Sequence, residues 1–288
     1  MLHARGWRDA RELTTLVYRE SERKHLALAA AGVAYYFLMS LVPALALLAA
    51  VVASLPVLND SGELASFLGR VMPAQALSML DEVVATIQPY RASLFSFGVI
   101  VTLWLASAGG KGIIASLDLV YDVRTPRAPW LNRMLAFLLT LAVGALLLAA
   151  VALTLVGPFV ERALAVLVPV QSWWLVVWPY LQWLVAAAFT FTAISLLLTL
   201  APNAPAGERL TLPGALLAAV AWMTLSWGLG VYLHYFGEIK LDRFYGVFAT
   251  PVAVMIWLYW GAAAILLGAQ INASLASWRR ARRASDGS

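Results

Sequence analysis

The stretch LALAAAGVAYYFLMSLVPALALLAAVVASL, residues 26–55, contains no charged side chain. A bilayer core about 30 Å thick is crossed by roughly 20 apolar residues of α-helix, so this stretch is long enough to span a membrane. Five further apolar stretches of spanning length follow it, at Leu94–Val120, Leu135–Phe159, Trp173–Leu200, Leu212–Phe236 and Val247–Ala276. A soluble helix that is apolar on every face would have nothing to bury itself against. The sequence therefore predicts an all-α, polytopic membrane protein with six transmembrane helices.

The composition leaves no room for a sizeable soluble domain. Of the 288 residues, 62% are hydrophobic and 12% are charged, whereas an ordinary globular domain has about 25% charged residues. The chain contains no cysteine, which excludes disulfides, thiolate catalysis and cysteine-based metal sites. We expect residues 26–277 to form one membrane domain, preceded by a cytoplasmic segment, 1–25, and followed by a basic cytoplasmic tail, 278–288.

The distribution of positive charges predicts the orientation. Six spans place both termini on the same side of the membrane, and that side carries fourteen of the twenty lysine and arginine residues. The opposite side carries five, and Lys111 lies inside the second span. Since lysine and arginine are enriched in cytoplasmic loops, both termini are predicted to be cytoplasmic.

Two segments outside the spans are expected to be helical. Residues 4–24 are predicted to form an amphipathic helix at the membrane surface, held by apolar contact and anionic headgroups, with a specific partner site as the alternative. The connection Pro56–Arg91 has helical apolar spacing interrupted by Pro73, which predicts two short amphipathic helices in an outer cap, residues 56–92. The acidic residues of this cap either select cations or only face solvent.

Lys111 is the outstanding polar residue within the predicted spans. It lies in the sequence SAGGKG, residues 107–112, whose three glycines weaken the helix and let another backbone approach closely. Asp118 follows on about the same face of the helix. Charged residues inside membranes are rare and usually functional. Two interpretations remain: Lys111 lines a functional cavity, or it snorkels to the cytoplasmic headgroups or pairs with the aspartate.

The first span contains a second candidate region around Pro43. Proline removes the hydrogen bond to the carbonyl of Met39, so the sequence predicts a kink near the middle of the membrane. Tyr35, Tyr36 and Ser40 bring hydroxyl groups close to it. A kinked helix at this depth either lines a cavity or serves packing alone.

Further candidates are aromatic or amide side chains deep within the spans. Trp104, Trp257 and Tyr259 lie too deep for an interfacial aromatic belt, so they either pack between helices or wall a cavity. Asn272, in the sequence GAQIN, is predicted to make an interhelical hydrogen bond beside a contact between small residues.

The sequence shows no arrangement typical of an enzyme. The three histidines are far apart, and no phosphate-binding loop, nucleophile elbow or zinc-protease motif is present. We therefore expect no catalysis, no bound metal and no cofactor.

Several short motifs, in this order and spacing, resemble the YihY/BrkB family of bacterial inner-membrane proteins over roughly residues 20–277. They are Ala34-Tyr35-Tyr36 with Ser40-Leu41 and Pro43, Phe97-Gly98, Leu103-Trp104, Ala106-Ser107, Tyr121 with Arg124, Pro213-Gly214-Ala215, Tyr245-Gly246, Trp257-Leu258-Tyr259, Gly268-Ala269 and Asn272-Ala273. The resemblance implies a six-helix protein of the bacterial cytoplasmic membrane with no defined biochemical activity. Members have carried a ribonuclease BN label, which this sequence opposes because it has neither a metal-binding cluster nor an exposed basic domain to hold RNA.

Two functional hypotheses remain from the sequence. The first is a transporter or lipid translocator with an intramembrane cavity near Lys111 and Pro43, whose partners are membrane lipids with anionic headgroups. The alternative is a non-catalytic scaffold that contacts envelope proteins through residues 4–24 and the outer cap. Neither hypothesis involves nucleic acid, and the sequence names no substrate, coupling ion or oligomeric state.

Overall fold

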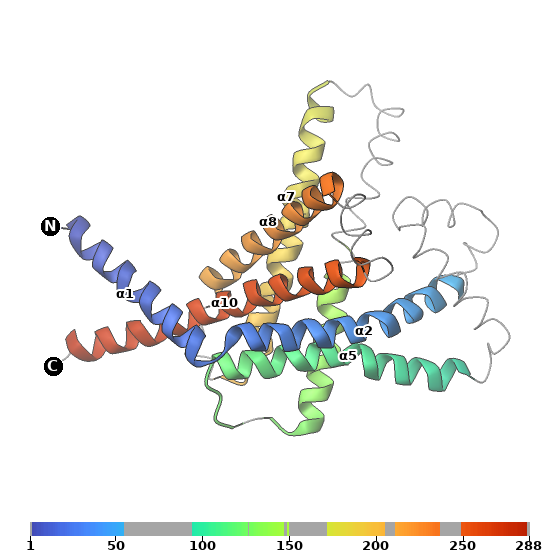
Figure 1. Ribbon diagram of the computed structural model, residues 1–288, viewed down its shortest axis with the longest axis horizontal. Helices are drawn as coiled ribbons and strands as arrows, with labels where there is room; N and C mark the ends of the chain where they lie inside the picture. The colour runs from blue at the N-terminus through green and yellow to red at the C-terminus, as the bar shows by residue number, and fades with distance from the viewer. Residues whose placement is uncertain are drawn as a thin grey trace.

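The computed structural model describes residues 2–54, 94–125, 127–146, 149, 172–204, 211–236 and 249–286. Every regular element within these residues is an α-helix, which confirms the predicted all-α class for this part of the chain. In chain order the helices are α1 (Leu2–Arg23), α2 (Leu26–Ser54), α5 (Leu94–Val120), an unlabelled helix at Pro129–Leu146, α7 (Ser172–Leu200), α8 (Leu212–Phe236) and α10 (Ala249–Asp286) (Figure 1).

Four of these helices have the length and composition to cross a membrane. Among the residues whose side chains are described, the apolar segments are Pro129–Leu146, Tyr180–Leu200, Leu212–Tyr232 and Pro251–Ser285, and Leu26–Ser40 is a shorter apolar helical segment. A helix satisfies its own backbone hydrogen bonds, which is the requirement for crossing hydrocarbon. The chain is thus an integral membrane protein with several spans.

The helices pack through small and branched apolar residues. α2 packs against α5, and α10 packs against both α2 and α8, while α7 contacts α8. Alanines such as Ala30, Ala218 and Ala269 are fully buried beside Ile113 and Leu266 at these contacts. Small side chains let helix backbones approach closely, which is how helices associate where no water is present to drive them together.

The outer surface of the helices carries large apolar side chains. Trp183, Leu184 and Trp227 are among the most exposed, and the last of these is 68% accessible. Exposed apolar surface of this extent marks a site of contact with lipid or another protein. It agrees with helices whose outer faces contact acyl chains.

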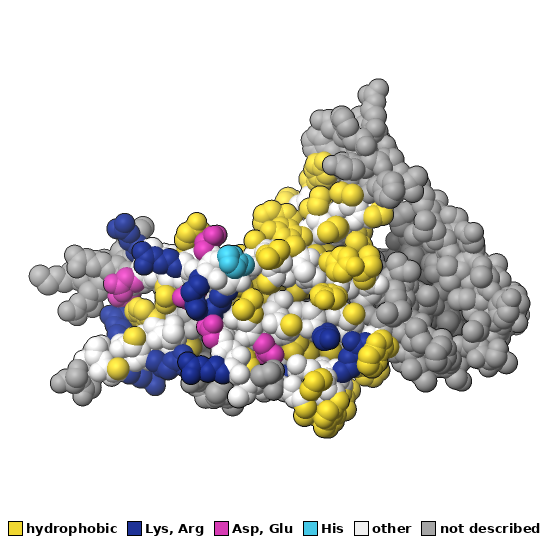
Figure 2. Space-filling view, turned by 60° about the horizontal axis from the view of Figure 1, so that its bottom comes forward, with side chains coloured by type: hydrophobic (Ala, Val, Ile, Leu, Met, Phe, Trp, Pro, Cys, Tyr) yellow, Lys and Arg dark blue, Asp and Glu magenta, His cyan; other side chains and the backbone are white. Residues whose placement is uncertain are grey.

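Charged side chains gather at one end of the molecule, where α1 lies against the C-terminal part of α10 (Figures 1 and 2). Asp9 of α1 accepts a hydrogen bond from Arg282 Nη1 of α10 at 2.7 Å. The last helix does not stop near Ala276 but continues to Asp286, so the basic tail predicted from the sequence is largely helical. The start of α1 and the end of α10 therefore share one end of the molecule.

Two predictions concern segments with limited description. The outer cap, residues 56–92, lies outside the described residues. So do the last residues of the predicted third span and the first residues of the predicted sixth span. α2 runs as one helix through Pro43, whose side chain is not described. The predicted kink there stays a prediction.

Candidate functional site

The three glycines around Lys111 lie where neighbouring helices touch α5. A Cβ atom on Gly109 would lie 2.9 Å from the ring of Phe37, and one on Gly112 would lie 2.9 Å from the ring of Tyr36. On the other side, a Cβ on Gly110 would lie 2.6 Å from Thr140 Oγ1 in the Pro129–Leu146 helix. The same Cβ on Gly110 would lie 2.7 Å from the backbone carbonyl oxygen of Ala136, so the expected close approach of another backbone is confirmed at this glycine. Packing against side chains accounts for the other two.

Lys111 itself is exposed, away from these contacts. Tyr35 and Tyr36 are also about half exposed, with their rings edge to face at 5.8 Å between centroids. Ser40 is buried against Gly109 and donates a hydrogen bond to the carbonyl of Phe37 at 2.9 Å. The structure therefore does not bring these four residues together around a shared polar space.

The deep aromatic residues make interhelical contacts. The guanidinium of Arg133 lies 3.6 Å from the ring centre of Trp104. Its Nη2 also donates a hydrogen bond to the backbone carbonyl of Trp104 at 2.5 Å. Trp257 Nε1 donates to Ser226 Oγ at 3.1 Å, across the contact between α10 and α8. Tyr259 is half-buried against the core. These contacts favour a packing role.

Asn272 makes the interhelical hydrogen bonds that the sequence predicts. Its Oδ1 accepts from the backbone N–H of Gly214 at 2.8 Å, and its Nδ2 donates to the carbonyl of Thr211 at 3.0 Å. The Gly214 N–H belongs to the first turn of α8, where backbone N–H groups have no hydrogen-bond partner within the helix. Asn272 is fully buried, and Gly214 and Gly268 are in backbone contact beside it. This side chain of α10 thus caps α8.

Asp118 joins a network that the sequence did not reveal. Its Oδ1 accepts from the backbone N–H of Asn203 at 2.8 Å, just after α7 ends. Arg127 donates to three carbonyls at the same helix end, those of Leu200, Ala201 and Pro202. A cation at a helix C-terminus satisfies unpaired carbonyls and opposes the helix dipole. The network therefore fixes the end of α7 against α5 and the loop that follows it.

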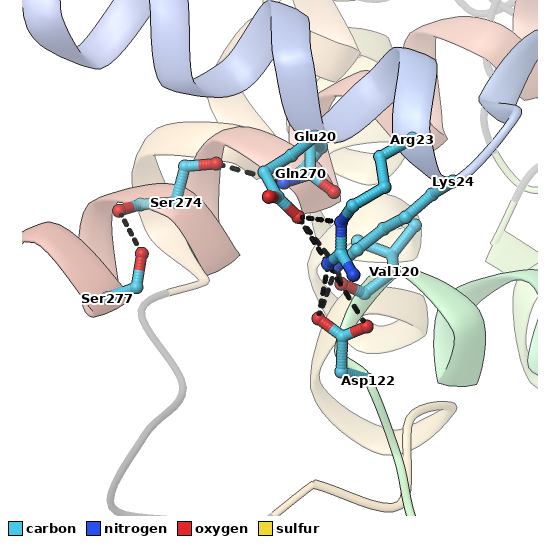
Figure 3. A network of polar contacts seen from close by, with 8 residues as sticks. All are labelled: Glu20, Arg23, Lys24, Val120, Asp122, Gln270, Ser274 and Ser277. Carbon is cyan, nitrogen blue, oxygen red and sulfur yellow. Dashed lines mark hydrogen bonds and ion pairs between the residues drawn. The ribbon is translucent and has the colours of Figure 1, made fainter.

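A cluster of ion pairs joins the end of α1 to the end of α5 (Figure 3). Lys24 Nζ lies 2.6 Å from Asp122 Oδ2 and donates to the carbonyl of Val120 at 2.5 Å. Arg23 Nη2 lies 2.6 Å from Glu20 Oε2 and 3.4 Å from Asp122 Oδ2. The hydrogen bond and the charge of Glu20 raise the pKa of Arg23 above its ordinary value. The Lys24 side chain is 5% exposed, and its Nζ also lies 3.8 Å from Glu20 Oε2.

Asp122 occupies a backbone position at which glycine is usual. Its φ is 50°, in the left-handed region. Its N–H donates to the carbonyl of Leu119, and the N–H of Val123 donates to the carbonyl of Asp118. These two bonds form the Schellman end of α5, where the left-handed residue is normally glycine. The aspartate adopts the same conformation and adds the carboxylate that Lys24 contacts.

His25 has the same left-handed conformation, with φ also 50°. Its N–H donates to the carbonyl of Glu22 at the end of α1, and its carbonyl accepts the N–H of Ala29 at the start of α2. One residue thus ends the first helix and begins the second. The direction of α1 depends on this residue and on the ion pairs beside it.

A cavity of about 630 Å³ lies at the junction of α1, the end of α5 and α10. Its polar lining comprises Glu20, Arg23, Lys24, Asp122, Arg124, Gln270, Ser274, Ser277 and Arg280. Leu16, Val120, Tyr121, Ala204, Ala273 and Ala276 complete the wall. Four basic and two acidic side chains give the lining a formal charge of +2. Among the described residues, no group of histidine, aspartate and glutamate side chains could hold a metal ion.

Gln270 is the most deeply buried polar residue of this wall. It is 1% exposed, and its Nε2 donates to Ser274 Oγ at 2.9 Å, one turn along α10 (Figure 3). Its Oε1 is buried and has no hydrogen-bond partner among the described residues. Arg124, which also lines the cavity, has an exposed side chain.

Of the eleven residues that the sequence singles out, Arg124 is the one that lines this cavity. Lys24, Asp122 and Gln270 escaped notice as a group because they come from three segments far apart in the chain: the turn after α1, the turn after α5, and α10. A signal was available for Gln270, since it stands between Gly268 and Asn272 in an apolar helix. Buried amides in such helices usually have a partner or a role.

Comparisons with known proteins agree on one family. The family model described as Virulence factor BrkB matches residues 17–288. The ribonuclease-like protein YfkH of Bacillus subtilis (strain 168) is 31% identical over 246 residues, covering 85% of this chain and 88% of the relative. A UPF0761 membrane protein of Rhodospirillum rubrum is 29% identical over 292 residues, covering 98% of this chain and 64% of the relative.

A UPF0761 membrane protein of Nitrosospira multiformis is 29% identical over 253 residues, covering 87% of this chain and 57% of the relative. The chain thus spans about three fifths of the length of these two UPF0761 proteins. No solved structure matches the chain.

Proposed function

Because the chain belongs to the BrkB virulence factor family of bacterial membrane proteins, we propose that it is a transporter or lipid translocator whose substrate enters the cavity between α1, α5 and α10. The proposal includes six spans in the bacterial cytoplasmic membrane, with both termini in the cytoplasm. The cavity then opens on the cytoplasmic side. The substrate class is anionic.

The single observation that carries this proposal is the lining of the cavity. Its net positive charge lies where α5 ends and where the basic part of α10 begins. Headgroups of anionic lipids lie at this depth in the predicted orientation, and basic pockets between helices on the cytoplasmic side bind such headgroups. The site therefore differs in place from the one predicted near Lys111 and Pro43, while the substrate class is the same.

The scaffold hypothesis has one observation in its favour. α1 and the C-terminal part of α10 extend together from the bundle, and Tyr18 on α1 is 69% exposed. A partner protein could contact this surface without using the cavity. Deletion of residues 1–20 would then abolish function, and substitutions within the cavity would leave it intact.

Reconstitution in vesicles tests the proposed transport. Purified protein is inserted into vesicles that contain a fluorescent phosphatidylglycerol, and a membrane-impermeant quencher measures how much of the probe reaches the outer leaflet. We expect exchange above that of empty vesicles, lost in Arg124→Gln and Gln270→Met. Arg19→Gln is the matched control, because it removes the same charge from an exposed position of α1 outside the cavity. Exchange equal to empty vesicles would contradict translocation of this lipid.

Ribonuclease activity is not part of the proposal. The name of the Bacillus subtilis relative is ribonuclease-like, and an assay settles the matter for this chain. We expect purified protein to leave RNA intact with magnesium, manganese or zinc added. Cleavage that copurifies with the protein and is unchanged in the Arg124→Gln variant would show a ribonuclease activity that does not depend on the cavity.

A further inference from the structure

One face of α5 carries a charge that no described residue neutralises. Lys111 is exposed on this face, together with Trp104 seven residues before it. Residues seven apart lie on the same side of an α-helix. Lys111 forms no ion pair with a described residue, and the carboxylate of Asp118 accepts the N–H of Asn203 instead. The interpretation in which Lys111 pairs with this aspartate therefore does not hold in the structure.

A second cation lies beside Trp104. The guanidinium of Arg133, on the Pro129–Leu146 helix, lies over the Trp104 ring, and its Nη2 donates to the Trp104 carbonyl. These two contacts hold the guanidinium in place without neutralising it, because neither partner carries a negative charge. Its Nη1, which has two N–H donors, has no hydrogen-bond partner among the described residues. Arg133 therefore presents an oriented cation next to α5.

Packing between the two helices brings the two cations to the same region. A Cβ on Gly110 would lie 2.7 Å from the carbonyl oxygen of Ala136, and Arg133 comes three residues before this alanine. Side chains lean toward the N-terminus of their helix, so Lys111 extends toward Trp104 and the guanidinium above its ring. Figure 2 shows basic side chains close together within a largely hydrophobic surface, away from the charged end of the molecule.

The surface beside the two cations is apolar. The exposed side of the Pro129–Leu146 helix includes Trp130, Met134, Leu138 and Leu141. These residues recur at helical spacing and form one stripe, which acyl chains can cover. A cation among such side chains is expensive unless an anion partners it. A ligand that suits this face is therefore apolar along most of its length and negatively charged at one end.

We propose that Lys111 and Arg133 bind the phosphate of an anionic phospholipid, whose acyl chains lie along Met134, Leu138 and Leu141. A guanidinium binds phosphate oxygens with directed hydrogen bonds, and an ammonium adds a point charge. This lipid is held on the outer surface of the helices and is not the substrate in the cavity. The inference therefore goes beyond the proposed function and does not depend on it.

The site lies below the cytoplasmic headgroups in the predicted orientation. Lys111 is nine residues from the end of α5 at Val120, or about 14 Å of helix. A bilayer thins beside a cation at such depth, because headgroups and water move toward the charge. The bound lipid is therefore held deeper than its neighbours in the same leaflet.

The absence of cysteine from the chain allows a probe to be placed beside the site. Ala115 is exposed one turn beyond Lys111, so a fluorophore on Ala115→Cys reports what covers this side of α5. The protein is reconstituted in mixed phosphatidylglycerol and phosphatidylcholine, and one of the two lipids at a time carries bromine on its chains. Bromine quenches fluorescence at close range, so the quenching measures which lipid lies beside the probe. Charge-assisted hydrogen bonds of about 1.5 kcal/mol or more predict a preference for phosphatidylglycerol of about tenfold.

Substitutions in the Ala115→Cys background test the two cations. Lys111→Gln and Arg133→Gln should each remove most of the preference, whereas Lys111→Arg keeps the charge and should keep the preference. Arg19→Gln, at an exposed position of α1, is the matched control and should change nothing. Arg133→Gln also loses the bond to Trp104, so the exposed Lys111→Gln decides the result if gel filtration shows that the former is misfolded.

Three outcomes would overturn the proposal. The first is equal quenching by the two lipids, or a preference that persists in Lys111→Gln. The second is the same preference at a fluorophore on Val220→Cys, on the exposed face of α8, because it would show only a general attraction of anionic lipid to a basic protein. The third is quenching by neither lipid, which would mean that protein covers this face.

The same preparation separates this site from the proposed transport. Arg124→Gln should abolish lipid exchange and leave the preference at Ala115→Cys intact. A preference without lipid exchange in the unsubstituted protein would keep this site and reject the transport. Exchange without a preference would keep the transport and reject this site.

Discussion

Two polar contacts between helices, one between α10 and α8 and one between the ends of α1 and α5, are built in opposite ways. At the contact with α8, Asn272 is fully buried, neutral and hydrogen-bonded at both ends of its amide, with Gly214 against Gly268. At the charged end, Lys24 and Asp122 form an ion pair whose aspartate is 60% exposed, beside a cavity. The contact at Asn272 leaves no space between the helices, whereas the contact at Lys24 and Asp122 borders a cavity.

The difference indicates which part of the molecule holds its shape and which can move. A satisfied neutral amide among close-packed backbones is lost only when the helices separate. The Arg23–Asp122 pair at the charged end is exposed on both sides, and such pairs contribute little stability because water can replace them. We therefore expect α8 and α10 to behave as one rigid unit and α1 to be the mobile element.

Gly214→Ala should have the largest effect. The added Cβ would lie against the carbonyl oxygen of Gly268 and 2.5 Å from Asn272 Nδ2, so the two helices must separate. Overpacking of this kind typically costs about 1–3 kcal/mol, and we expect the upper end of that range. The measurement is the melting temperature in detergent. Gly228→Ala on the same helix is the control, because no atom lies within 4 Å of a Cβ added at this position. Alanine is also more favourable than glycine within a helix. Equal melting temperatures for the two variants would refute the rigid contact.

Asn272→Leu should have the next largest effect. The change keeps the volume of the side chain but leaves the Gly214 N–H without its partner. It also removes one of the two donors to the Thr211 carbonyl, which still accepts the N–H of Ala215. Each buried group left unpaired costs about 1–3 kcal/mol. The melting temperature again reports the effect, with Ser277→Ala as a control at an exposed position of the same helix. An unchanged melting temperature would mean that the amide contributes nothing to the contact.

Lys24→Met should weaken the attachment of α1 while the bundle stays folded. The substitution removes the donor to Val120 and the partner of Asp122, and hydrogen bonds to charged groups contribute about 1.5–3 kcal/mol at most. Hydrogen exchange of the α1 amides should become faster, with exchange in α8 unchanged. Arg23→Gln is the contrast, because its side chain is 59% exposed and its loss should not alter exchange measurably. Faster exchange throughout the protein would show that the two regions are not independent.

The smallest perturbation, a serine-to-cysteine change, locates water in the structure. Ser40 is buried against Gly109, and Ser277 lines the cavity. In oriented membranes a membrane-impermeant thiol reagent should label Ser277→Cys from one face and leave Ser40→Cys unlabelled. An unfolded sample of the second variant must react, as a check on the reagent. Labelling of Ser40→Cys in folded protein would show that water reaches this residue, and it would support the hypothesis of a cavity near Pro43.

The sequence predicts the parts of this molecule that depend on local composition. The all-α class, the membrane location and the small-residue contact at Asn272 follow from apolar length and from the spacing of glycine and amide residues. The cavity could not be predicted, because its wall joins Lys24, Asp122 and Gln270 from three segments that are distant in the sequence. Lys111 was a candidate because it is a charged residue in an apolar stretch. The sequence does not distinguish a lysine that faces inward from one that is exposed, and in the structure Lys111 is exposed.

The length of α10 places three contacts on one helix. Its 38 residues extend for about 57 Å at 1.5 Å per residue, nearly twice the thickness of a bilayer core. Asn272, Gln270 and Arg282 therefore stand on a single helix, which carries the contact with α8, part of the cavity wall and the ion pair with Asp9 of α1. Because α1 contributes both to this ion pair and to the cavity wall, a partner that displaces α1 at the exposed end changes the cavity without entering it.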